Sequence, residues 1–144
     1  MQKSRITHYF FILSLIGAVM LLASACSNKQ KSTSSNGKVS IVASTNVYAD
    51  IAKNVAGKYG DVQAVIKNSA TDPHDFEPTT ADAKNLTKAN IIVANGLGYD
   101  NWMNQLASSV NKKPVLVGED LMHLKKGDNP HIWYNLNMPT KYVN

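Results

Sequence analysis

Short apolar runs alternate with amphipathic stretches from residue 39 onward. The first run, Val39 to Ala43 (VSIVA), is rich in β-branched residues and has no polar face, which is typical of a strand buried on both sides. Similar runs predict strands at Val62 to Ile66, Ile91 to Ala94 and Val115 to Val117. Because helical patterns separate these runs, we expect an α/β fold whose four strands form an open, mostly parallel sheet with right-handed crossovers.

Three helices are expected between these strands. Asn46 is a candidate cap for the first helix, which a following glycine can end. Thr79 or Thr80 can cap a weaker second helix that runs to about Lys88. The apolar positions at helical spacing are Tyr48, Ile51, Ala52, Val55, Ala56 and Tyr59 in the first helix and Trp102, Met103, Leu106, Ala107 and Val110 in the third.

The N-terminus has the layout of a secretory signal peptide. Lys3 and Arg5 form a basic region, and an apolar stretch of 14 residues follows from Phe10 to Ala23. This stretch is shorter than the roughly 20 residues that a transmembrane helix needs. Small residues then lead to Cys26. We therefore interpret residues 1–25 as a signal peptide.

Cys26 is the only cysteine, and it stands where a lipid would be attached. The stretch Leu22 to Cys26 (LASAC) resembles a bacterial lipobox, in which cleavage leaves the cysteine as a lipidated N-terminus. Plain secretion remains the alternative, because small residues also precede the cleavage point. The following polar segment, residues 26–38, suits a flexible tether. The folded part, residues 39–144, is therefore expected outside the cytoplasm, with lipid on Cys26 holding it at the bacterial cell membrane.

Composition and charge exclude several classes. The 144 residues are 44% hydrophobic and 17% charged, which suits one globular domain. A single cysteine excludes a disulfide framework and a cysteine-rich zinc module. The net charge is +5, but Lys3 and Arg5 account for two of the 15 basic residues, which leaves +3 beyond residue 25. The remaining lysines are scattered along the sequence, so no nucleic-acid partner is expected.

Two x-Pro-His tripeptides carry the candidate chemistry. Asp72-Pro73-His74 follows the second predicted strand, and Asn129-Pro130-His131 follows the fourth. Proline stiffens each backbone, and an aromatic residue, Phe76 or Trp133, follows each histidine by two positions. Neutral imidazole binds zinc and other transition metals, and loops at the carboxyl edge of a parallel sheet can converge. His74 and His131 are therefore candidate metal ligands, although hydrogen-bonded or solvated loop histidines are the plain alternative.

The same segments resemble a known family. DPHDFEPT (residues 72–79), IIVANGLGYDNWM (91–103) and NPHIWYN (129–135) are similar to the substrate-binding lipoproteins of bacterial metal-ion ABC transporters, which capture zinc or manganese outside the membrane. The resemblance implies that His74 and His131 are the first two ligands and that an ABC transporter permease is the partner. It implies Zn2+ or Mn2+ as bound cargo, and two nitrogen donors favour zinc.

The resemblance also implies more than this chain contains. Members of the family have two α/β lobes joined by one long helix, and the second lobe supplies a histidine or glutamate and an aspartate as further ligands. The sequence stops where that helix should start, and Pro139 suits a first helical position. We therefore expect residues 39–144 to be the N-terminal lobe alone, with half of the coordination shell and with the apolar residues of the last segment lacking a partner layer.

Two other functions stay open beside this leading, non-enzymatic hypothesis. A secreted zinc hydrolase could use both histidines with Glu77 as base, although no His-Glu-x-x-His helix is present. A surface interaction or adhesion module could carry His74 and His131 incidentally. The nearby acidic residues Asp72, Asp75 and Glu77 suit either metal chemistry or simple loop hydrogen bonds.

Overall fold

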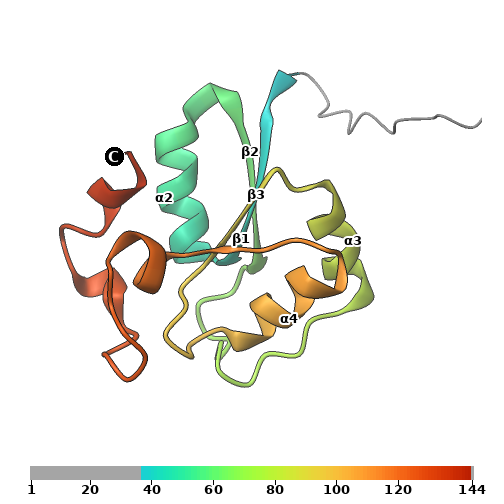
Figure 1. Cartoon of the computed structure of the whole chain (residues 1–144). Coiled ribbons are helices and arrows are strands. Elements are labelled where there is room, and N and C mark those ends of the chain that lie inside the picture. Colours follow the sequence, from blue (N-terminus) through green and yellow to red (C-terminus); the bar gives the residue numbers. More distant parts are fainter. Residues whose placement is uncertain (1–36, 144) are drawn as a thin grey trace, which may run out of the picture. The chain divides into compact units, whose positions relative to one another are not determined.

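Four parallel strands form a single sheet in the computed structural model, which describes residues 37–143 (Figure 1). The spatial order of the strands is β2-β1-β3-β4. The α/β fold with an open parallel sheet is therefore confirmed. The strands are β1 (Val39–Thr45), β2 (Gly60–Ile66), β3 (Ile91–Ala94) and β4 (Val115–Leu116).

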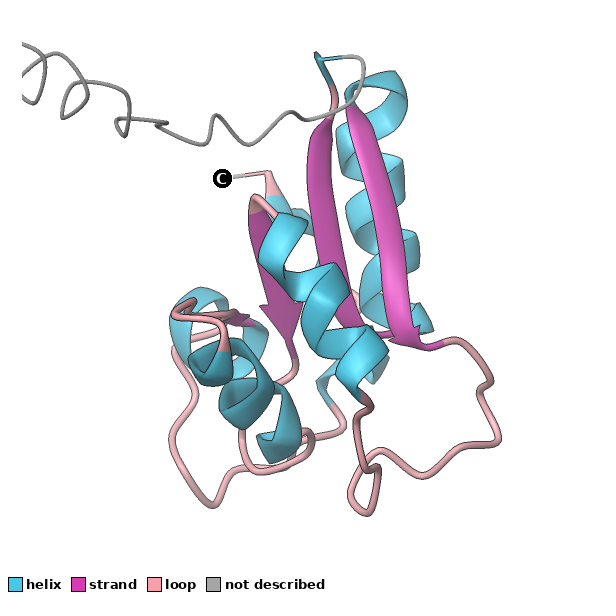
Figure 2. Cartoon of the chain, turned by 90° about the vertical axis from the view of Figure 1, so that its right-hand side faces the viewer, coloured by secondary structure: helices cyan, strands magenta, loops and turns pink. Residues whose placement is uncertain are grey.

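Helices cover both faces of this sheet (Figure 2). On one face lies α2 (Asn46–Ala56), which is followed by the short 3-10 turn η3 (Gly57–Tyr59). On the other face lie α3 (Thr80–Lys88) and α4 (Asn101–Ser109). All three predicted helices are present. No helix among residues 37–143 has the length and apolar character needed to cross a membrane.

The two faces explain why β1 has no polar side. Ile41 and Ala43 pack in the cluster on the α2 face. Val42 points the other way, into the cluster that α3 and α4 complete around Met103. Because successive side chains of a strand alternate between faces, a strand covered on both sides carries apolar residues on both, as Ile41, Val42 and Ala43 do.

A capping box sets the start of α3. The Thr79 hydroxyl accepts a hydrogen bond from the Asp82 backbone N–H at 3.3 Å, and the Asp82 carboxylate accepts one from the Thr79 N–H at 2.8 Å. Two N–H groups that the helix itself cannot pair are thereby satisfied. The cap also fixes the end of the loop that carries His74. At the other end of the sheet, Gly57 terminates α2 with a φ of 52°, as glycine does readily.

Several predicted boundaries were wrong. The second strand begins at Gly60, not at Val62, and Tyr59 lies in η3, not in the first helix. The first helix is preceded by Thr45, not capped by Asn46, because β1 continues through Thr45 and Asn46 is already helical. The fourth strand ends at Leu116, and Val117 begins the π-helical turn η4 (Val117–Leu121). The Asp120 carboxylate accepts a hydrogen bond from the Leu116 N–H at 2.8 Å, so a side chain takes the place of a backbone acceptor at this end of the strand. Val117 is nevertheless fully buried, as an apolar residue would be both in a strand and in a helical turn.

The segment after η4 contains no strand within the described residues. It forms two 3-10 turns, η5 (Ile132–Tyr134) and η6 (Pro139–Tyr142), and Pro139 stands at the start of the second as expected. Ile132 and Met138 are buried in the cluster on the α2 face, so the expectation that apolar residues here lack a partner layer was wrong for these two. It holds for the exposed side chains of Tyr134, Leu136 and Val143. The predicted signal peptide, Cys26 and the tether up to residue 36 lie outside the described residues.

Candidate metal centre

Both x-Pro-His tripeptides fold into the same turn. The Asp72 carboxylate accepts a hydrogen bond from the His74 backbone N–H at 2.9 Å, and the Asn129 side-chain oxygen accepts one from the His131 N–H, also at 2.9 Å. A side chain bonding its own backbone two residues on defines an Asx turn. The sequence left Asp72 with two possible roles, in metal chemistry or in a loop hydrogen bond, and the structure shows the loop hydrogen bond. Both histidine side chains are exposed.

Tyr99 lies between the two histidines. Its ring centroid is 4.8 Å from that of His74 and 6.1 Å from that of His131, with edge-on geometry in both pairs. Tyr99 belongs to the loop between β3 and α4, His74 to the loop after β2, and His131 to the segment after β4 and η4. Loops from three strands therefore bring two imidazoles to the same phenol ring at the carboxyl edge of the sheet.

The two aromatic residues that follow the histidines take different positions. Trp133 packs against the ring of Tyr99 at 5.0 Å and against His131 at 5.2 Å, so it forms one wall of the site. Phe76 instead packs against Trp102 at 4.7 Å, on the core side of its loop. A cavity of about 210 Å³ opens beside the site, bordered by Tyr99 and Trp133.

Helix α4 holds the His74 loop in place. The indole N–H of Trp102 donates a hydrogen bond to the Pro73 carbonyl at 2.9 Å. Trp102 is 7% exposed and sits in the core beneath the loop. The proline that directly precedes His74 is therefore attached to a rigid element, which limits the positions open to the imidazole.

Hydrogen bonding determines which nitrogen of His131 is available. Asn129 Oδ1 lies 2.7 Å from His131 Nδ1 and also accepts the His131 backbone N–H. Since a group that accepts from a backbone N–H must be the amide oxygen, Nδ1 must carry the hydrogen that points at it. The lone pair of Nε2 then remains for a metal ion or a hydrogen-bond donor.

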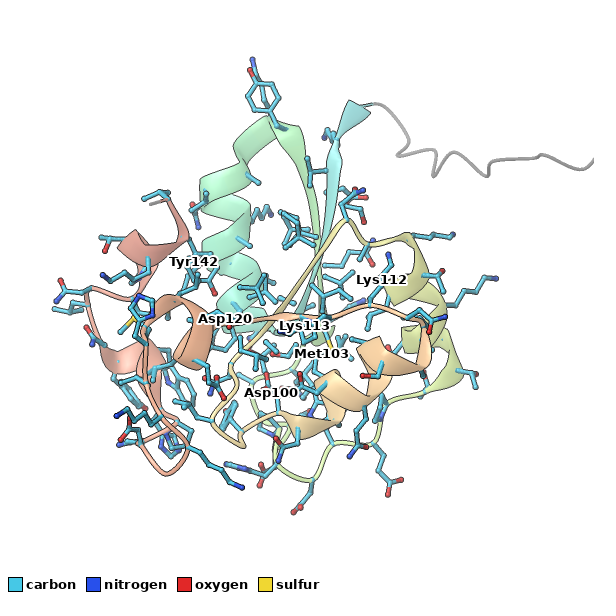
Figure 3. All side chains as sticks on the ribbon, in the orientation of Figure 1. Asp100, Met103, Lys112, Lys113, Asp120 and Tyr142 are labelled. Atoms are coloured by element: carbon cyan, nitrogen blue, oxygen red, sulfur yellow. The ribbon has the colours of Figure 1, made fainter. Side chains whose placement is uncertain are left out.

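A buried carboxylate supports the loop that carries Tyr99. Asp100 is 1% exposed and accepts hydrogen bonds from the backbone N–H groups of Asn95 at 2.7 Å and Gly96 at 3.0 Å. Burial raises the pKa of the Asp100 carboxyl, and these hydrogen bonds oppose the shift. Figure 3 labels Asp100 beside the start of α4. Burial also raises the pKa of the Tyr99 hydroxyl, so the ring at the site is neutral at pH 7.

Gly96 allows the same loop to approach η4 closely. Its φ is 79°, and a Cβ built on it would lie 1.9 Å from Glu119 Oε2. The other Glu119 oxygen accepts the Leu97 N–H at 2.9 Å. Only glycine combines this backbone conformation with so close a carboxylate. Gly96 is thus a backbone requirement of the loop that positions Tyr99.

Acidic side chains surround His74, but no larger ligand group forms. Asp72, Asp75 and Glu77 are exposed within three residues of it. Across residues 37–143 no three His, Cys, Asp or Glu side chains gather closely enough to hold a metal ion. His123 lies outside both turns and is exposed, with a φ of 57°. The structure thus brings together two candidate ligands and leaves His123 apart.

Comparison with known proteins identifies the family. The profile described as "Zinc-uptake complex component A periplasmic" (ZnuA) matches residues 41–144. The chain belongs to this family. Similar proteins include the metal ABC transporter substrate-binding lipoprotein SsaB of Streptococcus sanguinis, at 33% identity over 86% of this chain and 45% of the relative. The manganese ABC transporter substrate-binding lipoprotein ScaA of Streptococcus gordonii is 35% identical over 94% of this chain and 47% of the relative. The chain therefore spans less than half the length of these relatives.

Solved structures agree with this assignment. The Zn(II)-bound ZnuA-like domain of AdcA from Streptococcus pneumoniae matches with a TM-score of 0.60 and 26% identity, over 73% of this chain and 40% of that one. The metal-dependent lipoprotein YcdH from Bacillus subtilis gives a TM-score of 0.62 and 26% identity, over 72% and 40%. The predicted family and fold are confirmed, and the relatives' names as lipoproteins of metal ABC transporters agree with the predicted extracytoplasmic, membrane-anchored location.

Sequence reasoning missed two residues of the site. Tyr99 was given no role, although an aromatic residue in the loop that follows the buried strand β3 was a usable signal. Asn129 was seen only as the residue before Pro130. Asn129 stands two residues before His131, as Asp72 stands two residues before His74. Its side-chain oxygen can also accept a hydrogen bond from the His131 imidazole, and these two facts were the signal that could have revealed it.

Proposed function

We propose that this chain captures a divalent transition metal outside the cytoplasm, without catalysing a reaction, and delivers it to an ABC transporter permease. His74 and His131 are the proposed ligands. The observation that carries the proposal is the position of these two exposed imidazoles, which border the ring of Tyr99 from two separate loops. Membership of the ZnuA family supports it.

The chemistry around the histidines suits a cation. Asp72, Asp75 and Glu77 are exposed beside His74 and make the local potential negative. Asn129 leaves Nε2 of His131 as the free donor atom. Zinc–nitrogen bonds are about 2.0–2.1 Å long, so joint coordination requires that one nitrogen of each imidazole reach the same ion.

We further propose that residues 39–144 form one lobe and supply half of the coordination shell. The chain spans 45% and 47% of two relatives, which agrees with one lobe of a two-lobed protein. A second lobe would add the remaining ligands. Residues 1–25 are the proposed signal peptide, and residues 26–38 are the proposed tether after lipid-bearing Cys26. The relatives' names as lipoproteins support this N-terminal assignment.

Zinc is the proposed cargo and manganese the alternative. Two imidazole nitrogens favour zinc, whereas manganese prefers oxygen ligands. The similar proteins include both kinds, since ScaA is named for manganese and the AdcA domain was solved with Zn(II). A secreted hydrolase with Glu77 as base is less favoured, because the relatives are named as substrate-binding proteins. The same names disfavour an adhesion module with incidental histidines.

Native mass spectrometry on protein extracted from its source membrane tests the proposal directly. It measures polypeptide length, lipid on Cys26 and bound metal in one experiment. We expect a diacylated species that carries one zinc ion, or one manganese ion if oxygen ligands dominate the full shell. A species that remains metal-free after zinc and manganese are added would contradict metal capture. Cleavage of a model ester or peptide that is lost on His74→Ala would favour the hydrolase instead.

Asn129→Ala is expected to weaken zinc binding by about 10- to 100-fold, the usual effect of removing a group that orients a metal-binding imidazole. The variant loses the acceptor that fixes the His131 ring and its tautomer. Calorimetric zinc titration measures the effect. Asn137→Ala is the matched control, since this exposed residue lies on the same segment away from the imidazole. An equal loss in both variants would assign the effect to the segment as a whole, and no loss in Asn129→Ala would refute the positioning role.

A further inference from the structure

Lysines that are scattered in the sequence gather at the amino edge of the sheet, opposite the candidate metal centre. Helix α2 ends there and β1 and β2 begin there, at the top of Figure 1, and α3 ends lower in the picture, where β3 begins. We call this set the basic edge. Its members are Lys38, Lys53, Lys58, Lys88 and Lys112.

Strand pairing and hydrogen bonds place these lysines together. Val39 lies opposite Gly60 in the β1–β2 pairing, so these two neighbouring strands begin side by side. Lys38 directly precedes β1, and Lys58 lies in the turn η3 directly before β2. Lys53 is in the last turn of α2, and Lys88 is the last residue of α3.

Lys112 follows α4 but reaches the same edge. Its ammonium donates hydrogen bonds to the carbonyls of Thr87, at 2.8 Å, and of Ala89, at the end of α3. Within the described part of the chain, Asp61 is the one acidic residue at a strand start or helix end of this edge. The edge therefore carries a clear excess of positive charge.

Helix stabilisation accounts for only part of this arrangement. Cations at helix C-termini offset the helix dipole, which explains Lys53, Lys88 and Lys112. Lys38 and Lys58 lie outside the α-helices, and both are exposed. The helix dipole therefore does not account for the positive charge that they add.

A large aromatic side chain is exposed among the lysines. Tyr59 is 69% exposed, and the Lys58 ammonium lies 5.2 Å from its ring centroid. Val39 and Ile91, at the starts of β1 and β3, are each 41% exposed. Tyrosine is enriched at membrane–water interfaces, and clustered lysines are attracted to anionic lipid. Exposed aromatic and aliphatic groups among lysines match the chemistry of a lipid headgroup layer.

We propose that the basic edge binds the anionic phospholipid headgroups of the membrane to which the chain is tethered. Lys38 directly follows the predicted tether, whose Lys29 and Lys31 add charge of the same sign. A dozen residues between Cys26 and Lys38 span at most about 40 Å, so the tether keeps the lobe near the surface. This inference is independent of the proposed metal ligands.

Vesicle sedimentation of the full chain tests the proposal. The vesicles contain phosphatidylcholine alone or a 70:30 mixture with phosphatidylglycerol. The triple variant Lys53→Gln, Lys58→Gln, Lys88→Gln removes three charges from the edge. The control, Lys67→Gln, Lys125→Gln, Lys126→Gln, removes three exposed charges elsewhere. Both variants retain the same N-terminal segment, so its apolar contribution cancels in the comparison.

We expect the basic-edge variant to bind phosphatidylglycerol vesicles about 100-fold more weakly than the unchanged chain. Each lysine near an anionic surface contributes roughly fivefold to the affinity, and the variant loses three of them. The control should lose less than about fivefold, and high salt should remove the difference. Circular dichroism verifies that both variants are folded. Equal losses in the two variants would show attraction by net charge without a preferred face and would overturn the proposal, as would no loss in the edge variant. Zinc titration should be the same for the edge variant and the unchanged chain, so failure here is distinguishable from failure of the metal site.

Discussion

Replacing His74 or His131 by alanine is expected to lower the zinc affinity of this chain by about 100-fold or more. Removing a group that only orients a ligand usually costs 10- to 100-fold, and loss of a ligand itself should cost at least as much. His74 and His131 are the two nitrogen donors of the candidate site, so either substitution leaves it a single imidazole, which holds a divalent ion weakly. Zinc titration in competition with a chromophoric chelator measures the change.

His123→Ala is the control for both variants. His123 is exposed and lies outside the two x-Pro-His turns, so its loss should leave zinc affinity unchanged. A double variant at His74 and His131 should show no measurable binding. If only one of the two single substitutions weakened zinc binding, joint coordination would be contradicted. If His123→Ala caused the same loss, binding would be attributed to dispersed surface histidines.

Met103→Ala is expected to lower the free energy of unfolding by about 2–5 kcal/mol, the usual range for truncating a buried methionine or leucine. Met103 is fully buried at the centre of the cluster that α3 and α4 form on the sheet. The structure can close such a space only in part, so the loss combines the lost burial with the cost of a cavity. Figure 3 labels Met103 on α4, among the side chains that face the sheet.

Urea unfolding followed by circular dichroism measures this change. Met103→Leu conserves volume and should cost less than about 1.5 kcal/mol. Leu136→Ala should cost almost nothing, because Leu136 is 92% exposed. A loss of less than about 1 kcal/mol in Met103→Ala would contradict the position of this side chain in the core. Since α4 also holds the His74 loop through Trp102, zinc affinity should fall wherever the variant is partly unfolded.

Local features of the candidate site followed the sequence rules. Each x-Pro-His turn needs only three consecutive residues, because an Asx side chain bonds the backbone two positions on. The start of α3 likewise depends on Thr79 and Asp82 alone. The misplaced end of the fourth strand shows the limit of such rules. An apolar residue such as Val117 is buried equally well in a strand or in a turn, and the hydrogen bond from Leu116 to Asp120 decided between them.

The sequence by itself determined the order of strands and helices, the two rigid histidine turns and the family, because each depends on residues close together in the chain. Only the tertiary structure decided which distant residues meet. Tyr99 lies between His74 and His131 because three loops leave the same edge of the sheet. The lysines form one basic edge because parallel strands begin, and their helices end, at the opposite side. Strand order and register determine which of these distant residues come close together, and neither is encoded in the periodicity of any single segment.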